Sequence, residues 1–318
     1  MKPLFEQPKR FNPINKAQTV LLYDSLNLFF SCVLSKAYGS FSTGGGKPSA
    51  HVYGTFSRIR GHIKKFTKPG QRVALVFAWD NEPKKAIELL PEYKMNRDER
   101  QQLDAEDLHW RLREYRKFLS TFPCTFVETE DEEADNVIAS LIAQQSRKKF
   151  YIMSSDKDLW QLLTKPNTRI VSLRKSELVT ESDLMKKYDI RYKKEAYKVA
   201  LYKAVMGDSG DNIPKIPRMP SKDFHEAMRN ISYRNNDDCV KILIESASKL
   251  AKPRCHDLLN EHVELVKRNL LLTRLKEDLD LKEKYHSGNK GKMEEFFNTY
   301  ECNSILHGNG YEFLFEQS

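Results

Sequence analysis

The chain has 318 residues, and its 53 Lys and Arg outnumber its 44 Asp and Glu to give a formal net charge of +9. With 40% hydrophobic residues it can bury a sizeable core, as one large domain or two smaller ones, and no apolar run approaches the ~18 residues of a membrane span. Five widely spaced cysteines without a Cys-x-x-Cys pair indicate neither a disulfide framework nor a zinc site, so we expect a protein of the reducing cytoplasm.

The first predicted elements are a loose tail, residues 1–18, and three short strands that each precede an aspartate. The strand-like runs are Thr19 to Tyr23, Arg72 to Trp79 and Phe150 to Ser155, and the acids that follow them are Asp24, Asp80 and Asp156. The runs are too apolar and too short for exposed helices. In a parallel sheet the carboxyl ends of the strands share one edge, so these three acids should converge there.

Five more acids follow in pairs or close by: Glu133 and Asp135, then Asp158, then Asp208 and Asp211. Glu133 and Asp135 open a predicted helix that runs to about Gln145. Eight carboxylates cannot all stay ionised side by side without counter-charge, and oxygen ligands without His or Cys favour Mg²⁺ or Mn²⁺, as two ions. For any single acid, helix capping or solvation is the alternative.

The remaining chain divides into a strand-rich and a helix-rich part. Strands and helices alternate over residues 19–182, which predicts an α/β core with a mostly parallel central sheet flanked by helices. A polar helical segment interrupts this core between Pro83 and Pro123, and residues 183–318 read as helical and strand-poor. With eight acids set aside for a metal site, 53 basic residues face 36 acidic ones. That surplus predicts a polyanionic partner, although a solvated basic surface is the alternative.

Six segments, in this order, resemble the 5′ nuclease or flap endonuclease family, which includes stand-alone bacteriophage members and the nuclease domain of bacterial DNA polymerase I. They are Leu22–Asn27, Val76–Asp80, Glu92–Arg97, Glu133–Asn136, Ser154–Asp158 and Met206–Asn212. The resemblance implies a PIN-like core, a helical arch at about 84–122 and a helical DNA-binding region with a helix-hairpin-helix at about 195–235.

The implied activity is that of a divalent-metal-dependent 5′-3′ exonuclease and flap endonuclease in replication or repair. Its substrate would be DNA with a free 5′ end or flap, with RNA of RNA:DNA hybrids as a second candidate. The protein would be a monomer, acting in the host cytoplasm if it is of phage origin. A catalytically weak structure-specific DNA-binding protein and a PIN-like ribonuclease are the alternatives.

The same resemblance implies a role for each matched residue. The first metal cluster would comprise Asp24, Asp80, Glu133, Asp135, Asp156 and Asp158. The second would comprise Asp208 and Asp211, with help from Asp158 or Asp156. Lys94 and Arg97 would contact the scissile phosphate, and Tyr93 could stack on a base.

Two departures from the family pattern have consequences. Asn136 stands where a third acid usually follows Glu133 and Asp135, and a neutral ligand or donor there weakens the negative potential. The hairpin, Ile216 to Lys222, has two prolines and no glycine to supply amide donors or a positive φ. We therefore expect Arg218 and Lys222 side chains to bind duplex DNA, which argues against the potassium site that the resemblance implies.

Overall fold

A computed structural model describes residues 10–68, 70–95, 104–232, 238–308 and 310–315. Its centre is one mixed sheet in the order β7-β6-β5-β2-β3-β4-β8, with β1 beside β3. The strands are β1 Arg10–Phe11, β2 Thr19–Asp24, β3 Arg72–Ala78, β4 Pro123–Glu128, β5 Lys149–Met153, β6 Thr168–Ser172, β7 Glu177–Leu178 and β8 Lys282–Ser287. Only the β4–β8 and β6–β7 pairs are antiparallel among the described strands, so the predicted mostly parallel α/β core is confirmed.

Helices cover both faces of this sheet because successive strand residues point to opposite sides. Leu21 and Tyr23 pack with α1 Ser25–Val33, α2 Ala50–Phe66, α5 Ala105–Leu119 and α13 Lys290–Thr299. Val20 and Leu22 pack with α6 Ala134–Gln144, the 3-10 helix η2 Asp158–Thr164 and α7 Glu181–Tyr188. The apolar strands are therefore buried on both faces, as parallel strands usually are.

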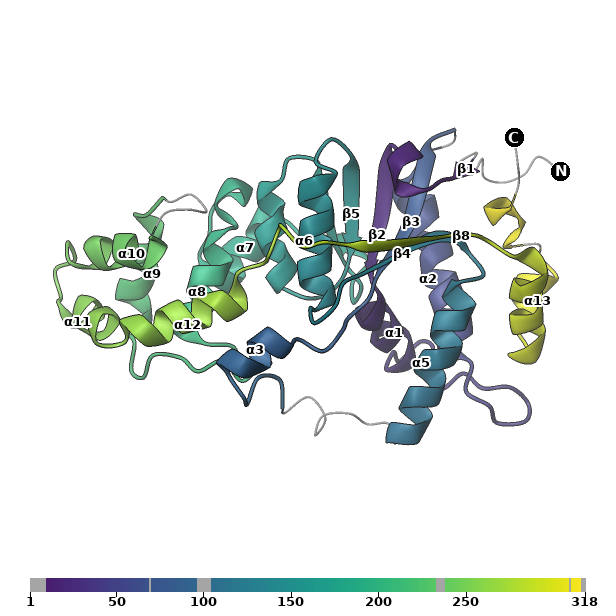
Figure 1. Ribbon diagram of the computed structural model, residues 1–318, viewed down its shortest axis with the longest axis horizontal. Coiled ribbons are helices and arrows are strands. Elements are labelled where there is room, and N and C mark those ends of the chain that lie inside the picture. Colours follow the sequence, from purple (N-terminus) through teal and green to yellow (C-terminus); the bar gives the residue numbers. More distant parts are fainter. Residues whose placement is uncertain (1–9, 69, 96–103, 233–237, 309, 316–318) are drawn as a thin grey trace.

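A third apolar cluster belongs to the helices that follow this core. They are α8 Lys198–Met206, α9 Ser221–Arg229, α10 Cys239–Ala247, α11 Arg254–Glu261 and α12 Val263–Thr273. These helices gather at one end of the molecule, while α13 lies at the opposite end (Figure 1). The short helices are α3 Lys84–Leu89, α14 Asn303–Leu306, η1 Ile14–Lys16, η3 Lys193–Glu195 and η4 Glu312–Leu314.

Two sequence-based expectations differ from this architecture. Residues 183–318 contain a strand, β8, which returns to the core and pairs with β4 along six residues. Its sequence, KEKYHS, has no apolar run because the strand lies at the exposed edge of the sheet. The tail prediction is wrong from residue 10 onward, because β1 pairs with β3 and the Ile14 side chain is buried. The division into domains otherwise stays a prediction.

No described helix combines the length and the apolar character that crossing a membrane requires.

Candidate metal centre

Asp24, Asp80 and Asp156 lie at or shortly after the carboxyl ends of the neighbouring strands β2, β3 and β5, where the sequence predicts them. Asp24 ends β2 and caps α1, where its carboxylate accepts hydrogen bonds from the Asn27 backbone at 2.9 Å and the Ser154 hydroxyl at 2.9 Å. Asp80 follows β3 and accepts from the backbone N–H of Ala134 at 3.2 Å. Capping and metal ligation are therefore not exclusive here, since each carboxylate oxygen has two lone pairs and can accept a hydrogen bond while it binds a cation.

Among the described residues there are two groups of three carboxylates in which one oxygen of each member lies within 4.8 Å of those of the other two, and the groups share one member. Asp135, Asp156 and Asp158 form one group, and Asp158, Asp208 and Asp211 form the other. The shared Asp158 begins η2, directly after the strand that leads to Asp156. Carboxylate oxygens at this spacing, from one buried and four half-buried residues and without His or Cys, fit hard divalent cations.

The protonation of the acids reflects their crowding. Burial, followed by the nearby carboxylate of Asp80, raises the pKa of Asp24 to about 7. Burial also raises the pKa of Asp158 to about 7, since burial together with Asp156 and Asp211 outweighs the attraction of Lys203. The pKa of Asp135 rises well above its ordinary value, again chiefly through burial. Without a cation, Asp24 and Asp135 therefore bind protons at pH values where ordinary aspartates are ionised.

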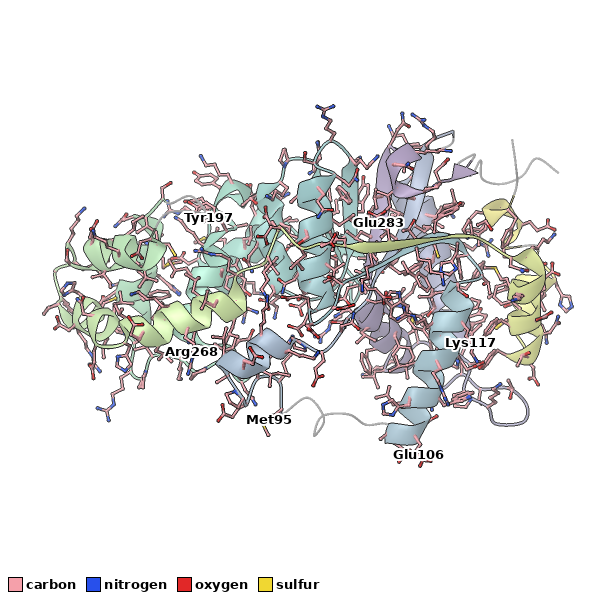
Figure 2. The ribbon with its side chains drawn as sticks, in the orientation of Figure 1. Met95, Glu106, Lys117, Tyr197, Arg268 and Glu283 are labelled. Atoms are coloured by element: carbon pink, nitrogen blue, oxygen red, sulfur yellow. The ribbon has the colours of Figure 1, made fainter. Side chains whose placement is uncertain are left out.

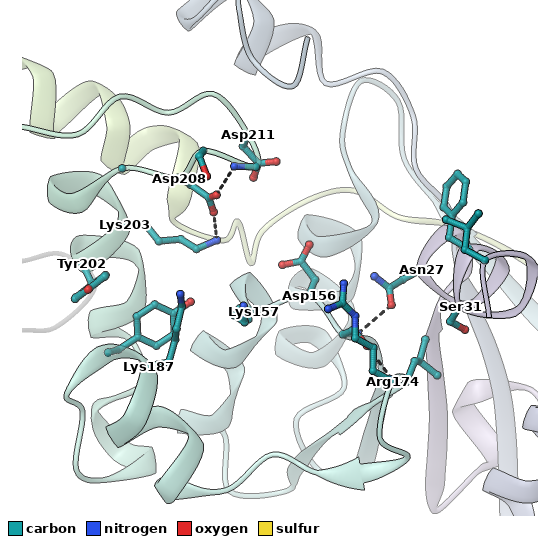
Figure 3. Close-up of a pocket in the computed structure, with 18 of the residues that line it drawn as sticks. Asn27, Ser31, Asp156, Lys157, Arg174, Lys187, Tyr202, Lys203, Asp208 and Asp211 are labelled. Carbon is teal, nitrogen blue, oxygen red and sulfur yellow. Dashed lines mark hydrogen bonds and ion pairs between the residues drawn. The ribbon is translucent and has the colours of Figure 1, made fainter. Parts of the chain in front are cut away.

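Lys203, on α8, is a site residue that the sequence reasoning missed. Its ammonium pairs with Asp158 and lies 2.6 Å from the carboxylate of Asp208 (Figure 3). Although burial alone would raise the pKa of Asp208, this ammonium and the Gly210 N–H lower it. A lysine within the largely apolar α8, five residues before Asp208, is a sequence signal for the pairing, although Lys198 begins the same helix.

Lys94 connects the two ends of the acidic cluster. Its ammonium pairs with Glu133, the residue that precedes α6, and lies 3.8 Å from Asp211. The hydroxyl of Tyr93 donates to Glu133 at 2.8 Å, and the Tyr93 ring is 7% exposed in a small apolar cluster. The ring is thus largely covered in this state, whereas the stacking prediction needs an open face.

Residues 96–103, including Arg97, lie outside the described residues, so its predicted role stays a prediction. Met95 and Glu106 flank this stretch and lie on the same side of the molecule (Figure 2).

A cavity of about 980 Å³ opens beside Asp156, Asp208 and Asp211. Its lining also includes the cationic side chains of Arg58, Lys157, Arg174, Lys187 and Lys203. Figure 3 labels Lys157, Arg174, Lys187 and Lys203 beside the acids. An acidic centre with a basic lining suits a ligand that carries phosphates.

The two departures from the family pattern have structural explanations. The Asn136 amide donates to Glu132 at 2.8 Å and its carbonyl oxygen accepts from the Lys276 backbone at 3.0 Å. This side chain therefore joins α6 to the segment after α12, and of the two expected roles, neutral ligand or hydrogen-bond donor, the structure shows the donor.

In the hairpin, Arg218 adopts φ 56°, so the expectation that a positive φ requires glycine here is wrong. Pro217, with its φ restricted by the ring, precedes Arg218 in this turn, and buried Ile216 and Met219 flank the pair. Arg218 and Lys222 are both exposed, which leaves their guanidinium and ammonium groups open to a partner.

A mostly parallel sheet whose carboxyl edge gathers acids, with lysines paired among them, has the arrangement of a metal-dependent phosphodiesterase. Residues 19–189, more than half of the chain, match the family model described as 5′-3′ exonuclease, N-terminal resolvase-like domain. The chain belongs to this family, and it is a nuclease.

Two curated relatives give the extent of the similarity. The chain is 28% identical over 214 residues to the 5′-3′ exonuclease of Buchnera aphidicola subsp. Schizaphis graminum, covering 66% of this chain and 69% of the relative. It is 25% identical over 314 residues to a thermostable DNA polymerase I of Thermus thermophilus, covering 96% of this chain. That alignment spans 34% of the polymerase, about a third of its length.

Solved structures share the fold. The T5 5′-exonuclease with bound divalent metal ions (zinc) matches with a TM-score of 0.58 and 21% identity, over 94% of this chain and 100% of that one. A bacteriophage T5 flap endonuclease in a complex with DNA and metal ions matches with a TM-score of 0.58 and 19% identity, over 93% and 98%.

Proposed function

We propose that this nuclease hydrolyses phosphodiesters of DNA with a free 5′ end or a 5′ flap, using two Mg²⁺ or Mn²⁺ ions. The observation that carries the proposal is the sharing of Asp158 by two groups of carboxylates, one with Asp135 and Asp156 and one with Asp208 and Asp211. Two cations with a common ligand stand close enough to act on one phosphate. DNA replication and repair supply such 5′ ends, so we place the activity there.

In this proposal the acidic residues bind the cations and the basic residue Lys94 contacts the phosphate. Asp24, Asp80 and Glu133 complete the acidic lining around the two groups. When bound, the cations would supply a water of lowered pKa and stabilise charge on the attacking and leaving oxygens. Lys94 then faces the phosphate in place of Glu133 and offsets its developing charge. The products would be a 5′ phosphate and a 3′ hydroxyl.

The T5 5′-exonuclease with bound divalent metal ions and the T5 flap endonuclease in a complex with DNA and metal ions support this proposal. Although Asn136 replaces one acid of the family pattern, Asp208 and Asp211 are both present beside Asp158, which argues against the alternative of a catalytically weak DNA-binding protein. A PIN-like ribonuclease would need neither Lys94 nor the helices α8 to α12.

The test is cleavage of an end-labelled 5′ flap, a nicked duplex and an RNA:DNA hybrid with Mg²⁺, Mn²⁺ or EDTA. We expect flap cleavage with either metal, none in EDTA, and loss of at least ~100-fold in Asp208→Asn. Asp257→Asn is the matched control, because this aspartate is exposed on α11, outside the two carboxylate groups. Cleavage in EDTA, or an Asp208→Asn rate within a few fold of the parent, would refute the proposal.

A further inference from the structure

Two distant segments meet next to the second carboxylate group. We call residues 84–95, which comprise α3 and the turn after it, the arch base, and residues 207–213 the acid loop. The side-chain amide of Asn212 donates to the carbonyl of Glu92 at 2.8 Å, across 120 residues of sequence. The backbone N–H of Lys94 donates to the carbonyl of Asp211 at 3.2 Å. Two directional bonds therefore join the arch base to the acid loop.

The acid loop is itself closed and rigid. Asp208 and Ile213 exchange two backbone hydrogen bonds, each 2.9 Å long. The Gly210 N–H donates to the Asp208 carboxylate at 2.8 Å, and Gly207 has φ 73° with no room for a Cβ atom beside the Ile213 carbonyl. A segment fixed to Asn212 is consequently fixed relative to the second carboxylate group.

Both joined residues adopt a left-handed backbone conformation, with φ 57° at Asn212 and φ 60° at Lys94. Asparagine tolerates this conformation better than most residues, whereas lysine does not. Strain of this kind persists only where neighbouring contacts hold it. Two kinds of contact hold Lys94 here. Its backbone N–H is hydrogen-bonded, and the neighbouring Leu90 and Tyr93 pack against Ile213.

We propose that Asn212 is a positioning residue for Lys94. It holds the arch base in register with the acid loop, so that the Lys94 ammonium is aimed at the space between Glu133 and Asp211. This inference rests on the proposed function, in which that space receives the phosphate. A displacement of ~1 Å in such a group can cost about 100-fold in rate, so one side-chain amide can matter without touching the substrate.

The test is a double-mutant cycle of Asn212→Gly and Lys94→Ala. Glycine keeps the positive φ without strain and removes only the side-chain amide. On a 5′ flap with Mg²⁺, we expect Asn212→Gly to lower the single-turnover rate by about 10- to 100-fold. In the Lys94→Ala background the same substitution should change the rate by less than about twofold, because its effect passes through Lys94.

Two readouts that do not need cleavage accompany the cycle. Mn²⁺ affinity by electron paramagnetic resonance, and flap binding with Ca²⁺ in place of Mg²⁺, should stay within about threefold of the parent. Asn167→Gly is the matched control, since its amide also donates to a backbone carbonyl, that of Ser146, but on an exposed loop away from the site. It should leave the rate unchanged.

Equal rate losses in both backgrounds, an unchanged rate in Asn212→Gly, or a Mn²⁺ affinity lowered more than about tenfold would each overturn the assignment. The last result would mean that Asn212 holds the metal ligands rather than Lys94. If Asn212→Gly does not fold, Asn212→Asp replaces it, because aspartate keeps the shape and presents an acceptor to the Glu92 carbonyl. A parent protein that leaves the flap intact would instead refute the proposed function and is thereby distinguished from these outcomes.

Discussion

The ammonium of Lys203 lies 2.6 Å from the carboxylate of Asp208, which belongs to the group of acids that would bind the second cation. It also pairs with Asp158, and its side chain is only 10% exposed. Although burial alone would lower the pKa of Lys203, these two carboxylates raise it, so the lysine stays charged. In the metal-free protein Lys203 is therefore an internal counter-charge for the acids.

Replacing Lys203 should destabilise the metal-free protein more than the metal-bound one. We expect Lys203→Met to lower the free energy of unfolding by about 3 kcal/mol in EDTA, since breaking a buried ion pair leaves carboxylates uncompensated. Saturating Mn²⁺ should recover part of this loss by neutralising the same acids. Urea unfolding in EDTA and in Mn²⁺ measures both values. Lys267→Met, an exposed lysine on α12, is the control, and equal losses in the two conditions would contradict the role.

A second expectation concerns pH in the absence of metal. The pKa of Asp24 rises from 3.8 to about 7 on folding, so between these values the folded state binds a proton that the unfolded state has released. Stability from this group is therefore present at low pH and declines as pH rises from about 4 to about 7, by at most ~1.4 kcal/mol per pH unit.

The measurement is the melting temperature in EDTA between pH 5 and pH 8. Asp24→Asn cannot ionise and keeps one oxygen to accept from the Asn27 N–H, while its NH₂ group can donate to the Ser154 hydroxyl oxygen, so its melting temperature should fall less steeply with pH. Parallel curves for the two proteins would show that Asp24 is ionised throughout. With Mn²⁺ present the decline should reverse, because cation binding displaces the protons.

The first half of the site could be predicted from sequence because its ligands follow strands. Asp24, Asp80 and Asp156 each end a run whose apolar pattern identifies a buried strand, and parallel pairing then brings their side chains to one edge. That argument needs no knowledge of long-range packing.

The rest depends on contacts between segments that local patterns do not encode. Asn136 looks like a site residue by sequence neighbourhood, yet its carbonyl oxygen binds the Lys276 backbone 140 residues away. Lys203 reaches Asp158 from a different helix. Strand β8 reads as polar because its pairing partner β4, and not an apolar face, stabilises it.

Lys94 should act on the reaction more than on binding. Its ammonium rests on Glu133 beside the acids, and its role in the proposed function is to offset charge that develops on the phosphate. We expect Lys94→Ala to lower the single-turnover rate by about 100-fold while flap affinity in Ca²⁺ falls by less than about fivefold. Quenched-flow cleavage and fluorescence anisotropy supply the two numbers. Equal losses in rate and affinity would identify Lys94 as a plain phosphate anchor.

The final prediction concerns the hairpin before α9, where a bound duplex can be held by exposed side chains but by few backbone amides. Pro217 and Pro220 lack the amide donors with which a glycine-containing hairpin holds phosphate, whereas Arg218 and Lys222 are exposed. Affinity that depends on these two side chains should show little preference between K⁺ and Na⁺ at equal ionic strength, within about twofold.

Arg218→Ala combined with Lys222→Ala should weaken duplex binding and lower the slope of log affinity against log salt by about 2, since two phosphate contacts no longer release counterions. Arg218 has φ 56°, and alanine and arginine have similar difficulty in adopting this left-handed conformation, so Arg218→Ala should leave the turn unchanged. The control is Lys16→Ala with Lys68→Ala, two exposed lysines next to the amino-terminal ends of β2 and β3, at the edge opposite the acids. A strict K⁺ requirement together with normal binding by the hairpin variant would instead mean that carbonyl groups of the hairpin hold a cation, despite the two prolines.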